Sequence, residues 1–161
     1  MIKCSSLKVL SVGKKTDRDF APAIRKYTDS LRKFTKLDFS FIRPEKSSGG
    51  IPPGEIVKKE SPRILEYIGT NKRTFPIALD SKGTLCGSRE FSRIFLRAVE
   101  SGETPLFIIG GIHGFSKSVR EKARKTISLS KLTFNHQLAG LILLEQVYRS
   151  FCIINNMEYH R

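Results

Sequence analysis

The chain has 161 residues, of which 39% are hydrophobic and 27% charged, and its 29 Lys and Arg outnumber 15 Asp and Glu to give a net charge of +14. This length and composition predict one folded domain spanning residues 1–161 and exclude a disordered or fibrous chain. No apolar run approaches the roughly 18 residues of a membrane span and no signal peptide pattern opens the chain, so we expect a cytoplasmic protein without membrane contact.

The first half of the chain predicts strands that alternate with helices. Apolar spacing and turn residues indicate a strand, a helix, a strand, a loop and a helix, in that order, over residues 2–12, 20–34, 37–41, 44–54 and 55–68. Pro62 is expected to interrupt the last of these helices and to occupy the first turn of a restarted one.

The second half continues the same alternation. It predicts strands over 75–79, 106–109 and 127–129, and helices that begin near Ser88, 116 and 136, the last of them ending near 151. A turn is expected at Gly83, and Ser88 is expected to cap its helix. The pattern as a whole predicts an α/β fold with a mostly parallel sheet. Ligands bind such sheets at the carboxyl ends of the strands, which are here Leu79–Asp80, Gly110–Gly111 and Leu129–Ser130.

The positive charge is concentrated at the two ends of the sequence. Residues 1–36 carry ten basic and three acidic groups, and residues 110–161 carry eight and three. If the ends meet in the fold, they form one surface that attracts phosphates, which favours RNA or DNA as a partner. The alternative is a generally basic, well-solvated protein.

The cysteines do not indicate a metal site. Cys4, Cys86 and Cys152 are far apart, and no Cys-x-x-Cys or Cys/His spacing of a zinc site is present. We expect reduced, partly buried thiols and no bound metal.

The last helix is apolar on all sides, because residues 138–144 read Leu-Ala-Gly-Leu-Ile-Leu-Leu. Such a helix must be buried on several sides. A homodimer interface achieves this in a small protein, and a central core helix in a monomer is the alternative. Glu145 and Arg149 are four residues apart and can pair across one helical turn as a structural ion pair.

The chain ends on Tyr159, His160 and Arg161, three side chains capable of acid–base chemistry where termini usually fray. We expect this trio to contact a substrate. The other histidines carry less weight: His113 is expected to be a polar turn residue, and His136 to cap the last helix.

Three segments resemble a known family: 128–137, 143–149 and 159–161, with support from 79–83 and 107–111. They are similar to the small SPOUT-class methyltransferases that act on pseudouridine in large-subunit ribosomal RNA, and the resemblance covers essentially the whole chain. It implies a deep trefoil knot near the C-terminus, which the usual rules of topology would exclude. It also implies an obligate homodimer that binds S-adenosylmethionine in the knot.

The resemblance implies functional residues as well. The cofactor contacts would be Leu79, Gly111, Ser130, Lys131, Leu132, Thr133, Phe134 and Asn135. Tyr159, His160 and Arg161 would position the substrate base and help to remove its N3 proton before methyl transfer to N3 of a pseudouridine in 23S ribosomal RNA. The substrate would be the assembled ribosome. Whether the cofactor lies in the same subunit or in the partner is left open.

The chain departs from the family pattern at three positions, one of which is Thr84, where a Lys usually follows the glycine. Asn135 stands where relatives usually have Pro, and Gly140 stands where an Arg is common. These departures keep two alternatives open: a non-catalytic protein that binds RNA or the ribosome, and a methyltransferase that acts on another RNA.

Overall fold

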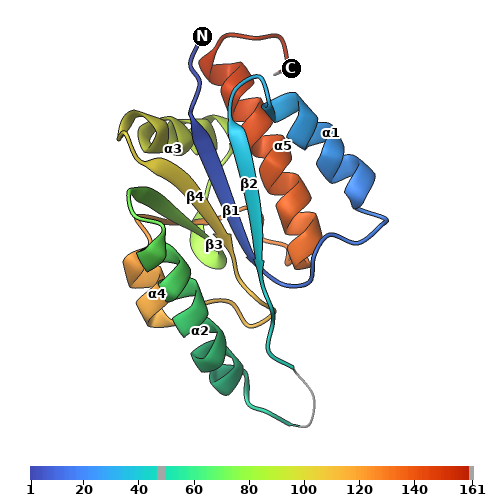
Figure 1. Cartoon of the computed structure of the whole chain (residues 1–161), viewed down its shortest axis with the longest axis vertical. Helices are drawn as coiled ribbons and strands as arrows, with labels where there is room; N and C mark the ends of the chain where they lie inside the picture. Colours follow the sequence, from blue (N-terminus) through green and yellow to red (C-terminus); the bar gives the residue numbers. More distant parts are fainter. Residues whose placement is uncertain (47–49, 160–161) are drawn as a thin grey trace.

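The computed structural model describes residues 1–46 and 50–159, which form a three-layer α/β fold (Figure 1). The central sheet has five strands in the order β2-β1-β4-β3-β5, and every neighbouring pair is parallel. The predicted parallel sheet is therefore confirmed. The strands are β1 (Ser6–Val12), β2 (Lys36–Ile42), β3 (Thr74–Leu85), β4 (Thr104–Ile109) and β5 (Lys125–Ser128).

Helices cover both faces of the sheet (Figure 1). One face carries α1 (Ala21–Leu31), α3 (Ser88–Glu100) and α5 (His136–Ile154), and the other carries α2 (Pro53–Thr70) and α4 (Lys117–Lys122). Parallel strands need a crossover between them, and helices on both faces supply it. Each face has its own apolar core.

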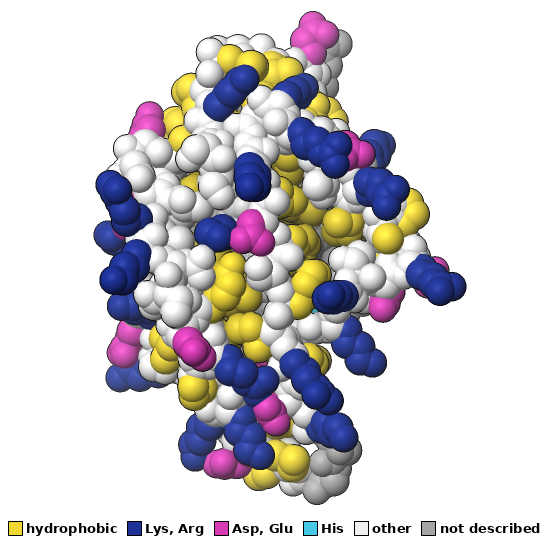
Figure 2. Space-filling view, in the orientation of Figure 1, with side chains coloured by type: hydrophobic (Ala, Val, Ile, Leu, Met, Phe, Trp, Pro, Cys, Tyr) yellow, Lys and Arg dark blue, Asp and Glu magenta, His cyan; other side chains and the backbone are white. Residues whose placement is uncertain are grey.

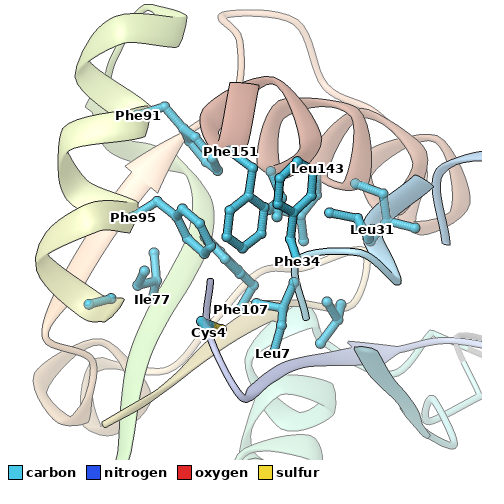
Figure 3. Close-up of a cluster of buried hydrophobic side chains, with 14 of the residues drawn as sticks. Cys4, Leu7, Leu31, Phe34, Ile77, Phe91, Phe95, Phe107, Leu143 and Phe151 are labelled. Atoms are coloured by element: carbon cyan, nitrogen blue, oxygen red, sulfur yellow. The ribbon is translucent and has the colours of Figure 1, made fainter. Parts of the chain in front are cut away.

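The larger core surrounds α5 and contains stacked aromatic rings (Figure 3). Phe151 of α5 stacks on Phe34 at 4.7 Å between ring centroids and meets the edge of Phe95 at 5.0 Å. Val147 and Leu143, one and two turns earlier on α5, are fully buried. The inner side of α5 is therefore a core element of the single subunit.

The outer side of α5 is only half-buried. The residues on this side follow helical spacing. They are the apolar Leu138, Leu141 and Ile142 and the charged Glu145 and Arg149. With 19 residues and a mean hydropathy of 1.2, α5 is long and apolar enough to cross a membrane by length and composition. Charged residues such as Glu145 and Arg149 interrupt its apolar sequence, so it is not a continuous apolar run. Packing of the inner side against the sheet accounts for this apolarity, because core helices share it.

β3 is longer than predicted and curls around β5. Leu79 and Thr84 both pair with Ile127 of β5, so the segment between them passes around that strand. Gly83 lies so close that a Cβ atom there would fall 2.6 Å from the carbonyl carbon of Ile127. The turn expected at Gly83 is therefore part of the strand, because glycine permits this backbone crossing.

Two local predictions are wrong. α2 continues through Pro62, which cannot donate the usual helical hydrogen bond four residues back; Lys58 at that position is exposed, where water can compensate. The N-cap of α3 is Gly87 rather than Ser88, and no side chain caps that end. Sequence patterns place helix ends only to within one or two residues, which explains the second error.

The two ends of the chain meet, as the charge distribution requires for a shared basic surface (Figure 1). Asn155 accepts a hydrogen bond from the backbone N–H of Ile2 at 2.5 Å and donates one to its carbonyl at 3.0 Å. Lys and Arg side chains are nevertheless spread over the whole visible face rather than gathered in one patch (Figure 2). The cysteines are free, and burial raises the pKa of each thiol.

Candidate functional site

A cavity of about 620 Å³ lies at the carboxyl ends of four strands, β1, β3, β4 and β5. It is the edge at which ligands bind parallel sheets. The loop that joins β5 to α5 forms one wall, and α2 closes the opposite side. The lining residues are Val12–Lys14, Pro44, Glu45, Glu60, Leu79–Ser81, Ile109–Ile112, Gly114, Ser128–Ser130, Leu132–His136 and Ala139.

Hydrogen bonds within the loop between β5 and α5 fix its shape. The Ser128 hydroxyl donates to the carbonyl of Ser130 at 2.7 Å, and the Ser130 hydroxyl accepts from the N–H of Leu132 at 2.9 Å. Asn135 is the N-cap of α5 and accepts from the N–H of Leu138 at 2.9 Å. Asn135 therefore anchors the end of the loop by capping the helix, which a proline cannot do.

His136 does not cap α5, contrary to the prediction, but begins it. Its ring packs on the backbone of Gly13 so closely that a Cβ at Gly13 would fall 2.3 Å from the ring. The Nε2 atom of His136 is buried and has no hydrogen-bond partner among the described residues. Glycine at position 13 thus lets the end of β1 and the start of α5 share one wall of the cavity.

The turn after β4 forms the next wall. The N–H of Gly114 donates to the carbonyl of Gly111 at 3.0 Å, and Gly114 has a φ of 74°, a conformation that favours glycine. A Cβ at Gly111 would lie 2.6 Å from the Oε2 atom of Glu60. His113, half-buried in this turn, does not line the cavity.

Three carboxylates line the cavity, although the protein is strongly basic. Asp80 accepts a hydrogen bond from the guanidinium of Arg120 at 2.8 Å, and Glu45 forms an ion pair with Arg63. Within the described part of the chain, Glu60 accepts only from the backbone N–H of Glu45, at 3.0 Å. Within the described ranges, no group of three His, Cys, Asp or Glu side chains is arranged to hold a metal ion.

The structure brings most of the predicted cofactor residues together. Seven of the eight line this one cavity, namely Leu79, Gly111, Ser130, Leu132, Thr133, Phe134 and Asn135. Lys131 is the exception, since it is exposed and does not line the cavity.

Sequence reasoning missed two parts of the lining. The end of β1, Val12–Lys14, could have been found, because every strand of a parallel sheet ends at the same edge. Glu45 and Glu60 come from the start of the 44–54 loop and from α2, and no pattern in the sequence signals that they reach this edge.

Tyr159, the described member of the terminal trio, folds back along α5. Its ring meets the edge of Tyr148 at 4.8 Å and lies 5.0 Å from the guanidinium of Arg149. Its hydroxyl lies 3.4 Å from both the Tyr27 hydroxyl and the Glu145 carboxylate. The hydrogen bond with Tyr27 raises the pKa of Tyr159 well above its usual range. His160 and Arg161 lie outside the described residues.

Tyr159 and the cavity are separated along α5. The hydroxyl of Tyr159 contacts Glu145, six residues after Ala139 of the cavity lining, and an α-helix rises about 1.5 Å per residue, so the two levels are roughly 9 Å apart along the helix. Within one subunit, Tyr159 is therefore displaced along α5 from the cavity that the predicted cofactor residues line.

The parallel sheet, the curl of β3 around β5 and a cavity at this edge together define the class of α/β methyltransferases with a SPOUT fold. The family described as "Predicted SPOUT methyltransferase" matches residues 6–160. The chain is 39% identical over 155 residues to ribosomal RNA large subunit methyltransferase H of Geotalea daltonii, covering 96% of this chain and 98% of that protein. The protein of the same name from Caldicellulosiruptor saccharolyticus is 35% identical over 155 residues, with coverage of 96% and 99%. The chain belongs to the SPOUT methyltransferase family and, within it, to the family of ribosomal RNA large subunit methyltransferase H.

Solved structures share the fold. A probable methylase family protein from Haemophilus influenzae matches with a TM-score of 0.61 at 14% identity, covering 98% of this chain and 71% of that one. A putative methylase family protein from Neisseria gonorrhoeae matches with a TM-score of 0.54 at 11% identity, covering 90% and 82%. The expected SPOUT-type fold is thus confirmed.

SPOUT methyltransferases use S-adenosylmethionine, and the cavity fits that cofactor. Its volume is in the range of small-molecule sites, and its walls combine apolar side chains such as Leu79 and Ile109 with a few polar groups. The glycines at 13 and 111 keep its walls in close contact with each other. The carboxylates suit a ligand that carries positive charge on its sulfonium and ammonium groups.

Proposed function

We propose that this methyltransferase acts on N3 of a pseudouridine in 23S ribosomal RNA, in the assembled ribosome, and that it works in the cytoplasm. The relatives named as large-subunit ribosomal RNA methyltransferases support the substrate. The net charge of +14 suits an RNA surface, because each neutralised phosphate releases counterions. The observation that carries the proposal is the cavity, which gathers seven of the eight expected cofactor residues at one sheet edge.

The reaction requires an electrophile and a nucleophile in line. Bound S-adenosylmethionine supplies a methyl group whose bond to sulfur breaks as the bond to N3 forms. The N3 position of a uracil-type ring carries a proton near neutral pH and is then a poor nucleophile. Removal of that proton is therefore the step that the protein's own side chains must assist.

The environment of Tyr159 indicates which roles its neighbours can take. Its raised pKa keeps the hydroxyl neutral, so Tyr159 can donate a hydrogen bond to the base but is not the group that removes the proton. Glu145 raises the pKa of Arg149, which keeps that guanidinium charged. A cation beside the base favours the N3 anion. We assign positioning of the base to Tyr159, with His160 and Arg161 completing the substrate end.

We further propose a homodimer in which Tyr159 of one subunit faces the cavity of the other. The separation of roughly 9 Å along α5 argues against a site made by one subunit. The half-buried outer residues of α5 provide an apolar surface for a second copy. An antiparallel arrangement of two α5 helices would bring the end of one beside the start of the other. Closed two-fold dimers are the commonest soluble oligomers.

Methylation of purified substrates tests the proposed activity. The protein would be incubated with radiolabelled S-adenosylmethionine and with ribosomes, free ribosomal RNA or transfer RNA, and the labelled nucleotide would be mapped by mass spectrometry. We expect label at N3 of a pseudouridine in the large-subunit RNA of ribosomes. Label confined to transfer RNA, or cofactor binding without transfer to any RNA, would refute the proposal.

A truncation tests the role assigned to the end of the chain. Removal of 159–161 is expected to abolish transfer while leaving cofactor affinity nearly unchanged, because Tyr159 lies far from its own subunit's cavity. Mixing this truncated protein with a variant impaired in the cavity would restore activity if each site uses both subunits. Full activity of the truncation alone would contradict the assignment.

A further inference from the structure

Glu60 is a buried carboxylate without a cation. It lies on α2, is 3% exposed and lines the cavity beside Gly111. Its Oε1 atom accepts the N–H of Glu45, and no lysine, arginine or histidine of the described residues forms an ion pair with it. A charge removed from water is costly unless a partner compensates it. The described residues therefore supply no cation that would compensate the charge of this carboxylate.

The other two carboxylates of the cavity differ from Glu60 in this respect. Arg120 neutralises Asp80, and Arg63 neutralises Glu45. Glu60 alone of the three leaves its negative charge available to a ligand. S-adenosylmethionine, the cofactor of this family, suits this carboxylate because its α-ammonium group carries a positive charge and three N–H donors.

We propose that Glu60 binds the α-ammonium group of S-adenosylmethionine. The inference rests on the cavity being the cofactor site and adds a residue that the family resemblance does not assign. A charge-assisted hydrogen bond in a buried setting is about twice as strong as a neutral one. An ammonium group compensates the buried charge, whereas the ribose hydroxyls of the cofactor supply hydrogen bonds without charge.

A purely structural role for Glu60 is the competing explanation. Its bond to Glu45, together with the bond of 2.7 Å from Arg63 to the carbonyl of Arg43, holds the segment after β2 against α2. The Glu60→Gln substitution separates the two roles, because the glutamine carbonyl can still accept the N–H of Glu45 while the negative charge is lost. Glu66→Gln is the matched control, since Glu66 is an exposed carboxylate on the same helix.

Calorimetric titration of wild type and both variants tests the proposal with three ligands. S-adenosylmethionine and S-adenosylhomocysteine both carry the ammonium group, and methylthioadenosine keeps the ribose but lacks the amino acid part. For Glu60→Gln we expect at least tenfold weaker binding of the first two ligands and less than twofold change for methylthioadenosine. Glu66→Gln should bind all three as wild type does. Failure of wild type to bind S-adenosylmethionine would instead contradict the cofactor site itself.

Thermal unfolding supplies a second measurement that does not depend on activity. Removal of an uncompensated buried charge should leave the Tm of the ligand-free protein unchanged or raise it, while the increase in Tm on adding S-adenosylmethionine becomes smaller. A lower ligand-free Tm with unchanged affinities would show that Glu60 only holds the segment after β2. An equal loss of affinity for all three ligands would overturn the ammonium assignment in favour of the ribose.

Discussion

Replacement of Gly83 by alanine perturbs the crossing of β3 over β5 with a single methyl group. The added Cβ would lie 2.6, 2.8 and 2.8 Å from the carbonyl carbon, Cα and nitrogen of Ile127, where carbon atoms normally approach to about 3.5–4.0 Å. Ile127 pairs with Leu79 and Thr84, so β5 cannot move away without losing one of these pairings. The clash is with backbone and cannot be relieved by a side-chain rotation.

The expected cost follows from these contacts. Overpacking of a well-packed region costs about 1–3 kcal/mol, and each lost backbone hydrogen bond adds about 1 kcal/mol. We expect Gly83→Ala to lower the free energy of unfolding by about 3 kcal/mol, which is a decrease in Tm of roughly 6–12 °C for a domain of this size. Because β5 leads into the loop of the cavity, affinity for S-adenosylmethionine should fall as well.

Urea unfolding followed by circular dichroism measures the change, and Gly69→Ala is the matched control. No atom lies within 4 Å of a Cβ at Gly69, which is in α2, so this variant should gain about 0.4–1 kcal/mol. Ordinary surface substitutions change the free energy of unfolding by no more than about 0.5 kcal/mol. If the free energy of unfolding of Gly83→Ala differs from that of wild type by no more than this, the crossing does not constrain the fold as described.

Three further predictions concern single side chains. Asn135→Ala should lower stability by about 1 kcal/mol through loss of the helix cap and weaken cofactor binding in calorimetry, whereas Asn135→Asp should retain both. Lys8→Met removes the ion pair with Asp38 and should cost less than about 1 kcal/mol at pH 7. Lys8 lowers the pKa of Asp38 in the folded state, so the stability advantage of wild type should decline as the pH falls below the ordinary value of 3.8 and vanish below the lowered folded-state pKa; an advantage in urea titrations that does not decline below 3.8 would contradict this origin. The pKa of Tyr159 is raised, so the stability that it contributes relative to Tyr159→Phe should be constant below its ordinary pKa of 10.0 and decline above it, as measured by unfolding across that range.

The sequence predicts the type and order of the elements because apolar periodicity records which side of each segment is buried. It predicts the parallel sheet for the same reason. It does not predict that β3 extends to Leu85 around β5, since the relevant signal is a single glycine whose neighbour, Ile127, is over forty residues away. Tertiary contacts of that kind leave no local pattern.

The candidate site was predictable to the extent that it consists of strand ends. Residues 130–135 follow a short strand, and family resemblance names them. Glu60 was not predictable, because a glutamate on an amphipathic helix usually faces water, and only the fold turns this one toward Gly111. The absence of a side chain at Gly140 leaves room for Phe39, whose ring lies 3.2 Å from the position that a Cβ would take.

The strand order has a consequence for how the protein matures during its own synthesis. β1 lies between β2 and β4, so the first strand must wait for residues 104–109 before its second neighbour exists. At roughly 5–20 residues per second, that delay lasts several seconds or longer. β5 and α5 emerge last of all, and the cavity needs both. The cavity therefore cannot form until residues 125–154 have been synthesised, so the cofactor site is completed later than the rest of the sheet.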